Sequence, residues 1–204
     1  MQKIIKYIKE VLSVVIPALA AALIINNLII ANAVVPTASM ESTIMTGDRV
    51  IGSRLSYSLF GDPERGDIVI FKFGVICSNC GAHIEGFDNE LCPNCESDLS
   101  HAKTLHYVKR LIGMPGDHIE ISGDPMNGGK MYINGEEVDE PYLNEDVYYI
   151  GEFSYDVPEG EYFFLGDNRN NSGDSRYWVY PYIKRENIEA KAVLKYYPSI
   201  AFLK

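Results

Sequence analysis

Two residues of this sequence could together perform nucleophilic catalysis. Ser39 carries a hydroxyl in the polar segment Pro36–Thr43, and Lys109 carries an amine in the segment Tyr107–Leu111. A neutral lysine can accept the proton of a serine hydroxyl, but a free lysine, with a pKa of about 10.4, is protonated at neutral pH. Burial of Lys109 would lower its pKa and make it a general base.

Local patterning by itself leaves both roles open. Alternation along a strand places Tyr107, Lys109 and Leu111 on one face and Val108 and Arg110 on the other. Either Lys109 or Arg110 could be the inward cation, and a lysine that faces solvent is the commoner arrangement. A serine in a polar loop is usually an ordinary turn residue. The two residues therefore need support from the rest of the chain.

A third polar segment, Gly166–Arg176, follows the apolar run Tyr162–Leu165 directly. Its eleven residues include two Asp, two Arg, three Asn and two Ser. Such a density suits a loop held by ion pairs and by bonds from side chains to the backbone. A solvated surface loop is the alternative, but the preceding apolar run favours packing of this segment against the core.

The composition indicates the class of protein that carries these residues. The chain has 204 residues, of which 47% are hydrophobic, enough for one sizeable domain with an anchor. Fourteen tyrosines favour β-structure. The net charge of −10 argues against nucleic acid as a partner, because phosphate binding needs clustered Lys and Arg.

The first 35 residues predict a membrane anchor. Lys3, Lys6 and Lys9 precede the uncharged run Val11–Val35, and about 20 apolar residues in a helix cross a bilayer. The run is longer than the apolar region of a cleaved signal peptide, which remains an alternative together with a buried core helix. The lysines predict a cytoplasmic N-terminus and one crossing, with residues 36–204 outside the cytoplasm.

Residues 36–204 predict a mainly β domain of coiled antiparallel sheets. The Asn134-Gly135 pair suits the type I′ turn of a hairpin. The β-like runs between Gly and Pro residues are Asp48–Ser53, Asp67–Phe73, Leu105–Ile112, Asp117–Ser122, Met131–Val138, Glu161–Leu165 and Ala190–Tyr197.

All four cysteines lie in residues 74–104, which interrupt the order of strands as an inserted module. Cys77 and Cys80 form one C-x₂-C pair, and Cys92 and Cys95 form the other after eleven residues. Four thiolates at this spacing predict a structural tetrahedral zinc site. Disulfides are the main alternative outside the cytoplasm, and iron is a lesser one. We expect the module to stabilise the fold or to dock a partner.

Four segments together resemble the bacterial type I signal peptidases. They are Pro36–Thr43, Arg65–Phe71, Tyr107–Asp117 and Gly166–Arg176, in the family's order behind an anchor. The resemblance implies the signal peptidase all-β fold, whose catalytic core is shared with self-cleaving SOS repressors. It implies a serine endopeptidase in the bacterial plasma membrane that removes N-terminal signal peptides from preproteins after Ala-x-Ala-like sites. Its implied partners are preprotein signal peptides, the lipid bilayer and a nearby secretion translocon, and catalysis needs no cofactor.

The resemblance also implies roles for individual residues. Ser39 matches the nucleophile and Lys109 the general base, where eukaryotic-type enzymes carry histidine. The Thr37 hydroxyl and the Ser39 N–H match the oxyanion hole, and Ser172 matches a serine that orients the lysine. Ion pairs that brace the site are implied for Arg110, Asp167, Asp174 and Arg176. Shallow pockets for small side chains are implied for Val35, Met40, Ile44 and Val108.

One position departs from the family pattern. Ser42 stands where the family usually has proline, which would stiffen the turn that presents the nucleophile. Ser42 also adds a second candidate hydroxyl, although Ser39-Met40 keeps the family register.

Two other functions stay open. A self-cleaving regulator is disfavoured by the anchor and by the absence of a DNA-binding segment, and the other is a non-catalytic, membrane-tethered zinc-ribbon protein.

Overall fold

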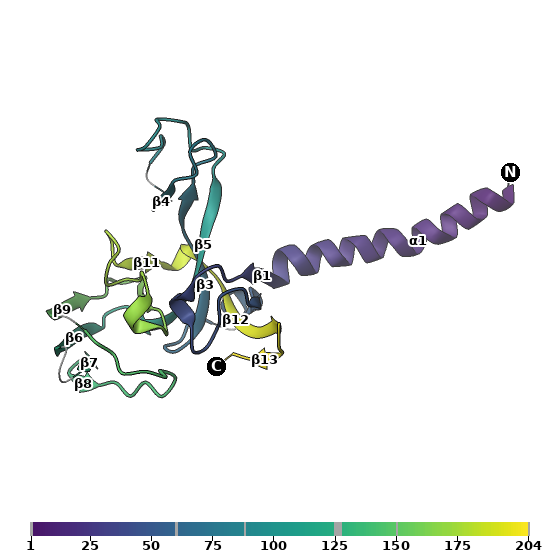
Figure 1. The fold of residues 1–204 in the computed structure, drawn as a ribbon. Helices are drawn as coiled ribbons and strands as arrows, with labels where there is room; N and C mark the ends of the chain where they lie inside the picture. Colours follow the sequence, from purple (N-terminus) through teal and green to yellow (C-terminus); the bar gives the residue numbers. More distant parts are fainter. Residues whose placement is uncertain (1, 60, 88, 125–127, 150, 204) are drawn as a thin grey trace.

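The computed structural model describes residues 2–59, 61–87, 89–124, 128–149 and 151–203. Met1 and Lys204, at the ends of the predicted segments, and Asp88, inside the predicted module, lie outside this range. The N-terminal helix α1 (Gln2–Ile24) continues through a π-helical turn (Ile25–Ile29) and projects away from a body of β-strands (Figure 1). The stretch Lys6–Ile29 is long and apolar enough to cross a membrane.

The uncharged run that predicts an anchor up to Val35 changes structure before it ends. The helix stops at Ile29, and β1 (Ile30–Val34) pairs with β2 (Arg49–Ser53). Ala31 and Val35 are buried in the domain core rather than placed on the helix. Hydrophobicity alone cannot separate the end of an anchor from the first strand of the domain, because both consist of uncharged residues.

A large antiparallel sheet has the order β1-β2-β12-β3-β5-β10-β11, with β13 on β12 and β4 on β3. Its other strands are β3 (Ile68–Ile76), β4 (His83–Glu85), β5 (Lys103–Gly113), β10 (Glu161–Leu165), β11 (Tyr182–Lys184), β12 (Ile188–Tyr197) and β13 (Ala201–Phe202). A second antiparallel sheet has the order β8-β7-β6-β9. It contains β6 (His118–Asp124), β7 (Gly128–Ile133), β8 (Glu136–Glu137) and β9 (Gly151–Asp156). The predicted mainly β fold is confirmed.

The helical segments in the rest of the described chain are short. They are α2 (Leu55–Ser58) and the 3₁₀ turns Ala38–Met40, Arg169–Asn171 and Arg185–Asn187. Each predicted β-like run overlaps at least one strand, and β3, β5, β6 and β12 extend beyond the predicted bounds. At the predicted hairpin, Asn134 and Gly135 both have positive φ angles, of 54° and 82°, as a type I′ turn requires.

Strand β10 belongs to the large sheet, and the side chains on its two faces are buried in two different hydrophobic clusters. Phe163 and Leu165 pack in the cluster that covers the second sheet, whereas Phe164 points the other way and stacks on Phe71, with ring centroids 4.6 Å apart. The β-strand period of two places alternate residues on opposite faces. The segment Gly166–Arg176 therefore starts from a strand whose side chains are packed in both clusters.

Strands β3 and β5 form a long ribbon that carries the cysteine module. They pair from Ile68 with Arg110 at one end to Ile76 with Lys103 at the other. In Figure 1 the ribbon rises out of the body of the domain, with β4 and the module at its tip. The strand that carries Lys109 therefore begins at the cysteine module.

Candidate active site

Ser39 and Lys109 meet in a buried position. Ser39 lies in the 3₁₀ turn that follows β1, and its exposed fraction is 7%. Lys109 lies in the second half of β5 and is 3% exposed. The Lys109 amine donates a hydrogen bond to Ser39 Oγ. A hydroxyl and an amine therefore face each other in a buried position, which is the geometry that proton transfer between them requires.

The surroundings of Lys109 favour its neutral form. Burial lowers the pKa of Lys109 to about 8, while the charges of Asp174 and Asp167 act in the opposite direction. The amine also lies 5.3 Å from the ring centroid of Tyr107, a contact that favours the cation. Loss of hydration is the largest effect. At pH 7 to 8 a useful fraction of Lys109 is therefore unprotonated.

The neighbouring cation, Arg110, is also buried and forms a separate ion pair. Its Nε and Nη2 donate to the two carboxylate oxygens of Asp167 at 2.8 and 2.7 Å, and its Nη1 donates to the Gly66 carbonyl. Thr43 Oγ1 donates to the same Asp167 carboxylate. Asp167 thus connects β5 to the segment after Ser39. Alternation could not choose between Lys109 and Arg110 because both faces of β5 are buried here.

A second ion pair closes the polar segment that follows β10. Arg176 donates from Nε and Nη2 to Asp174 at 2.8 Å each. The Gly166 N–H donates to Asp174 Oδ2 at 3.0 Å, and Arg176 Nη2 also donates to the Arg169 carbonyl at 2.8 Å. Asp174 is fully buried. These bonds hold the two ends of the segment together and explain its density of polar residues.

Asn168 binds this segment to the turn that carries Ser39. Its backbone N–H donates to the Ser39 carbonyl at 3.1 Å, and its Nδ2 donates to the Ala38 carbonyl at 3.0 Å. The sequence does not distinguish Asn168 from its polar neighbours. The only signal was its membership of the polar segment, which does not reveal that its partners lie about 130 residues earlier.

Arg169 is a further residue that the sequence did not identify. Its side chain is fully buried and donates to both carboxylate oxygens of Glu140, at 2.6 and 2.7 Å. It also donates to Tyr149 Oη at 3.0 Å and to the Gly166 carbonyl at 2.9 Å. The pair fixes the loop before β9 against the active-site segment. Glu140 stands in no motif, so its sequence gives no sign of this contact.

Thr37 and Ser172 differ in their relation to Ser39. Thr37 Oγ1 lies 3.3 Å from Ser39 Oγ. Ser39 itself lies in the short helical turn Ala38–Met40, and the first N–H groups of such a turn form no hydrogen bond within it. The Ser172 hydroxyl is buried and has no hydrogen-bond partner in the part of the chain that the structure describes. The expected bond from Ser172 to Lys109 is therefore not formed in this structure.

Ser42 lies apart from Lys109 and has an unusual backbone. Its side chain is exposed and donates to the Tyr142 carbonyl at 3.3 Å. Its φ angle is +90°, whereas the proline ring fixes φ near about −65°. A proline cannot adopt this backbone conformation. Ser42 therefore lacks the stiffening proline ring, and its turn also has a backbone conformation that a proline could not adopt.

A groove leads away from the dyad between two strands. It has a volume of about 680 Å³, and two runs of consecutive residues line it: residues 31–39, from β1 and the segment after it, and residues 103–109 of β5. Val35 and Val108 belong to its lining. Met40 and Ile44 do not, because they are fully buried in the cluster that also contains Val35.

The groove runs along two open strand edges. Among the described strands, β1 pairs only with β2, and residues 103–109 of β5 pair only with β3. The backbone N–H and C=O groups on the other edges are available to an added strand.

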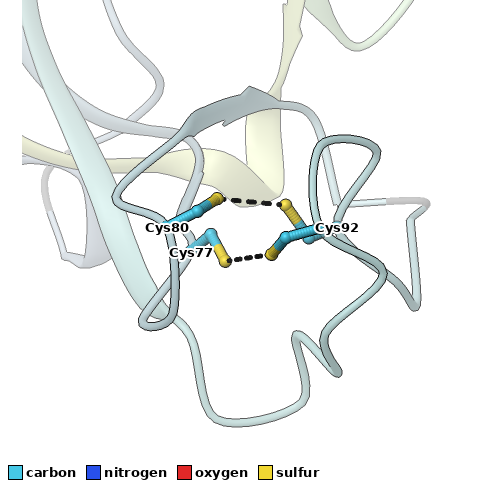
Figure 2. Close-up of side chains that lie close together, drawn as sticks. Cys77, Cys80 and Cys92 are labelled. Carbon is cyan, nitrogen blue, oxygen red and sulfur yellow. Dashed lines mark hydrogen bonds between the residues drawn. The ribbon is translucent and has the colours of Figure 1, made fainter.

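The four cysteines converge at the tip of the β3–β5 ribbon. Their sulfur atoms all lie within 4.8 Å of one another, and the sulfur pairs of Cys77 with Cys95 and Cys80 with Cys92 are 3.6 Å apart. Figure 2 shows the two sulfur pairs facing each other. Zinc–sulfur bonds of about 2.3 Å in a tetrahedron place sulfur atoms about 3.8 Å apart. All four cysteines are unbridged, and their arrangement fits one tetrahedral metal ion.

The two C-x₂-C pairs form matching turns. The Gly81 N–H donates to the Cys77 carbonyl and the Glu96 N–H to the Cys92 carbonyl, at 2.9 and 2.8 Å. Gly81 and Glu96 both have positive φ angles. Ser97 Oγ also lies 3.2 and 3.1 Å from the sulfur atoms of Cys77 and Cys95. A hydroxyl so placed can donate to metal-bound thiolates.

Comparison with known proteins gives one consistent result. The family model described as "Signal peptidase, peptidase S26" matches residues 8–197. A protein of Synechocystis sp. named "Probable signal peptidase I-2" is 35% identical over 167 residues, which cover 80% of this chain and 62% of the relative. "Signal peptidase I S" of Bacillus subtilis (strain 168) is 32% identical over 203 residues, covering 95% of this chain and 91% of the relative.

A solved structure is also similar. It is the crystal structure of a signal peptidase I from Enterococcus faecalis V583, at 29% identity and a TM-score of 0.42. The match covers 65% of this chain and 97% of that structure.

Two glycines of the active-site segment provide a test of its packing. A Cβ at Gly166 would overlap the Ser39 carbonyl oxygen and Ser172 Oγ, whereas a Cβ at Gly173 would contact nothing within 4 Å. We expect Gly166→Ala to lower the free energy of unfolding by about 1–3 kcal/mol, the usual result of overpacking. Gly173→Ala should change it by less than about 0.5 kcal/mol. Thermal unfolding of the full chain in detergent measures both, and equal effects would contradict the described contact.

Proposed function

Since the chain belongs to the signal peptidase family, peptidase S26, we propose that it removes N-terminal signal peptides from exported preproteins with Ser39 as nucleophile and Lys109 as general base. The observation that carries the proposal is the hydrogen bond from the Lys109 amine to Ser39 Oγ in a buried site. A pKa of about 8 for Lys109 supports it, because the base is then partly neutral at physiological pH.

The proposed reaction proceeds through an acyl-enzyme. Ser39 Oγ attacks the scissile carbonyl carbon while Lys109 Nζ accepts the hydroxyl proton. The oxyanion of the tetrahedral intermediate is stabilised by the Ser39 N–H and by the Thr37 hydroxyl, whose oxygen lies 3.3 Å from Ser39 Oγ. Protonated Lys109 then gives its proton to the departing amine. A water molecule, deprotonated by Lys109, attacks the ester; the bond from the acyl carbon to Ser39 Oγ then breaks, Lys109 returns the proton to Ser39 Oγ, and the signal peptide leaves.

The polar segment after β10 holds Ser39 and Lys109 in position relative to each other. The Arg110–Asp167 and Asp174–Arg176 ion pairs brace it, and Asn168 holds the Ser39 carbonyl. We assign to Ser172 the orientation of the lysine during turnover, because its buried hydroxyl faces Gly166 beside Ser39.

The groove supports binding of the substrate as an extended strand. A peptide laid between the open edges of β1 and β5 would form main-chain hydrogen bonds with them. Val35 and Val108 line the groove beside the dyad, and Met40 and Ile44 pack behind it. Shallow apolar sites of this kind accept small side chains, which suits an Ala-x-Ala pattern before the cut.

The anchor supports a position at the membrane surface. Ser39 follows Ile29, the last residue of the helical span, by ten residues, which reach at most about 35 Å when extended. The lysines before the helix support a cytoplasmic N-terminus and a catalytic domain outside the bacterial plasma membrane. Its partners would be the lipid bilayer, the signal peptides held in it and a nearby secretion translocon.

Substitution of the two serines tests the nucleophile. Ser39→Ala should lower preprotein cleavage in detergent by at least about 10⁴-fold, because Ser39 carries the only hydroxyl bonded to the base among the residues that the structure describes. Ser42→Ala should retain most activity, since Ser42 is exposed and bonded to Tyr142. Release of the mature protein is read on gels. Loss of cleavage in Ser42→Ala with retention in Ser39→Ala would reverse the assignment.

The pH profile tests the base. Because the neutral amine is the active form and its pKa is about 8, kcat/KM should rise about tenfold per pH unit below pH 8 and level off above it. The measurement uses a peptide without groups that titrate from pH 5 to 10. Lys109→Arg should be inactive throughout, and Lys184→Arg, changed at an exposed residue of β11, should follow the original profile. A plateau that continues down to pH 6 would exclude Lys109 as the base.

We further propose that the four cysteines bind one structural zinc ion. When bound, zinc would cross-link the two C-x₂-C turns and take no part in the cleavage reaction. The four unbridged sulfur atoms within 4.8 Å and the nearby Ser97 hydroxyl support this assignment.

Metal analysis tests the site. The purified chain should contain about one zinc per molecule, and four thiols should become reactive when it is removed. Cys92→Ser should lose the metal, whereas Ser78→Ala, at an exposed position between two ligands, should keep it. Absence of both metal and reactive thiols would establish disulfides instead.

A further inference from the structure

We infer that the base of the cysteine module forms the far end of the substrate groove and selects an acidic side chain about six or seven residues before the cut. The inference rests on the proposed function, and it names a specificity contact of the same site. It is carried by the continuity of the groove, by the direction of its two strands and by unpaired positive charge at its far end.

The groove is continuous from the dyad to the module. Its lining includes Ser39 and Lys109 at one end and Ile76, His83 and Lys103 at the other. Ile76 pairs with Lys103 on one side and with His83 of β4 on the other. Directly opposed residues of neighbouring strands point to the same face. The module therefore contributes a short three-stranded wall, with His83 and Lys103 on either side of Ile76.

The direction of the strands decides which part of a substrate lies there. Four antiparallel pairings lead from β1 through β2, β12 and β3 to β5, so β1 and β5 run in the same direction. Both lead toward the dyad, and β1 starts at the end of the membrane helix. The apolar part of a signal peptide lies in the membrane. The residues before the cut therefore extend back from Ser39 toward the starts of β1 and β5.

The length of the groove sets the position. Lys103 and Lys109 are six residues apart on one strand, and a strand advances about 3.3 Å per residue. The separation is therefore about 20 Å. A substrate strand whose residue at −1 lies beside Lys109 brings residue −6 or −7 beside Lys103. This is beyond the small-residue positions close to the cut.

Charge identifies the preferred side chain. Within the described residues, the side chains of Lys103 and His83 have no ion-pair or hydrogen-bond partner, and both residues are exposed. The carboxylate in this lining belongs to Glu189, and it already contacts Arg54 at 3.2 Å and His106 at 3.4 Å. In a chain of net charge −10, this is a local site for an anion. An acidic side chain at −6 or −7 would pair with Lys103.

Matched peptides test the inference with the full chain in detergent. Each has an Ala-x-Ala cut site and carries Glu, Gln or Lys at −6 or −7, and one further peptide begins at −4. For the unsubstituted protein, kcat/KM should be about three- to tenfold higher with Glu than with Lys at the responsive position, through KM, and less so at high salt. Lys103→Glu should invert this order. Lys184→Glu, with the same charge change at an exposed residue of β11, should keep it.

The outcomes separate the inference from the proposed function. Equal cleavage of the Glu and Lys peptides would overturn the inference, as would an inverted order in Lys184→Glu. Cleavage of the peptide that begins at −4 reports the dyad alone. If the unsubstituted protein does not cut that peptide or any longer one, the proposed function itself fails.

Discussion

The active site depends on keeping the amine of Lys109 out of water beside Ser39. Lowering the pKa of Lys109 from 10.5 to about 8 costs about 3 kcal/mol of folding stability when the amine is protonated. The folded state holds this proton less tightly than the unfolded chain. The cost is therefore complete below pH 8, decreases as the pH rises from 8 to 10.5, and is absent above that range. At neutral pH the remainder of the fold must offset it.

The two carboxylates that act on Lys109 are each held in an ion pair. Asp167 and Asp174 both raise the pKa of Lys109 and so act against the effect of burial. Each carboxylate receives two charge-assisted hydrogen bonds from an arginine, Arg110 or Arg176. Buried pairs of this kind add little net stability, so we interpret them as fixing the geometry of the segments around Lys109.

The sequence predicts what is local and misses what is long-range. Strand periodicity predicts the sheets, and Asn134-Gly135 predicts a turn that the structure contains. The start of β1 is hidden because an uncharged run looks alike in a membrane helix and in a buried strand. Asn168 and Glu140 escape detection because their partners are remote in sequence. Proposed catalytic roles for Ser39 and Lys109 required the resemblance of four segments, since neither residue is distinctive alone.

Under the inference above, the cysteine module would take part in aligning the substrate. Its own core is small, with Cys77, Ile84, Cys92 and Leu99 as the buried apolar residues of its cluster. A module of this size buries too little surface to fold by hydrophobic packing alone, and the proposed zinc ion would supply the missing cross-link. Because β5 runs from the module to Lys109 without interruption, order at the ribbon tip also fixes the open edge on which a substrate would align. The proposed base and the proposed substrate-binding edge thus lie on one strand.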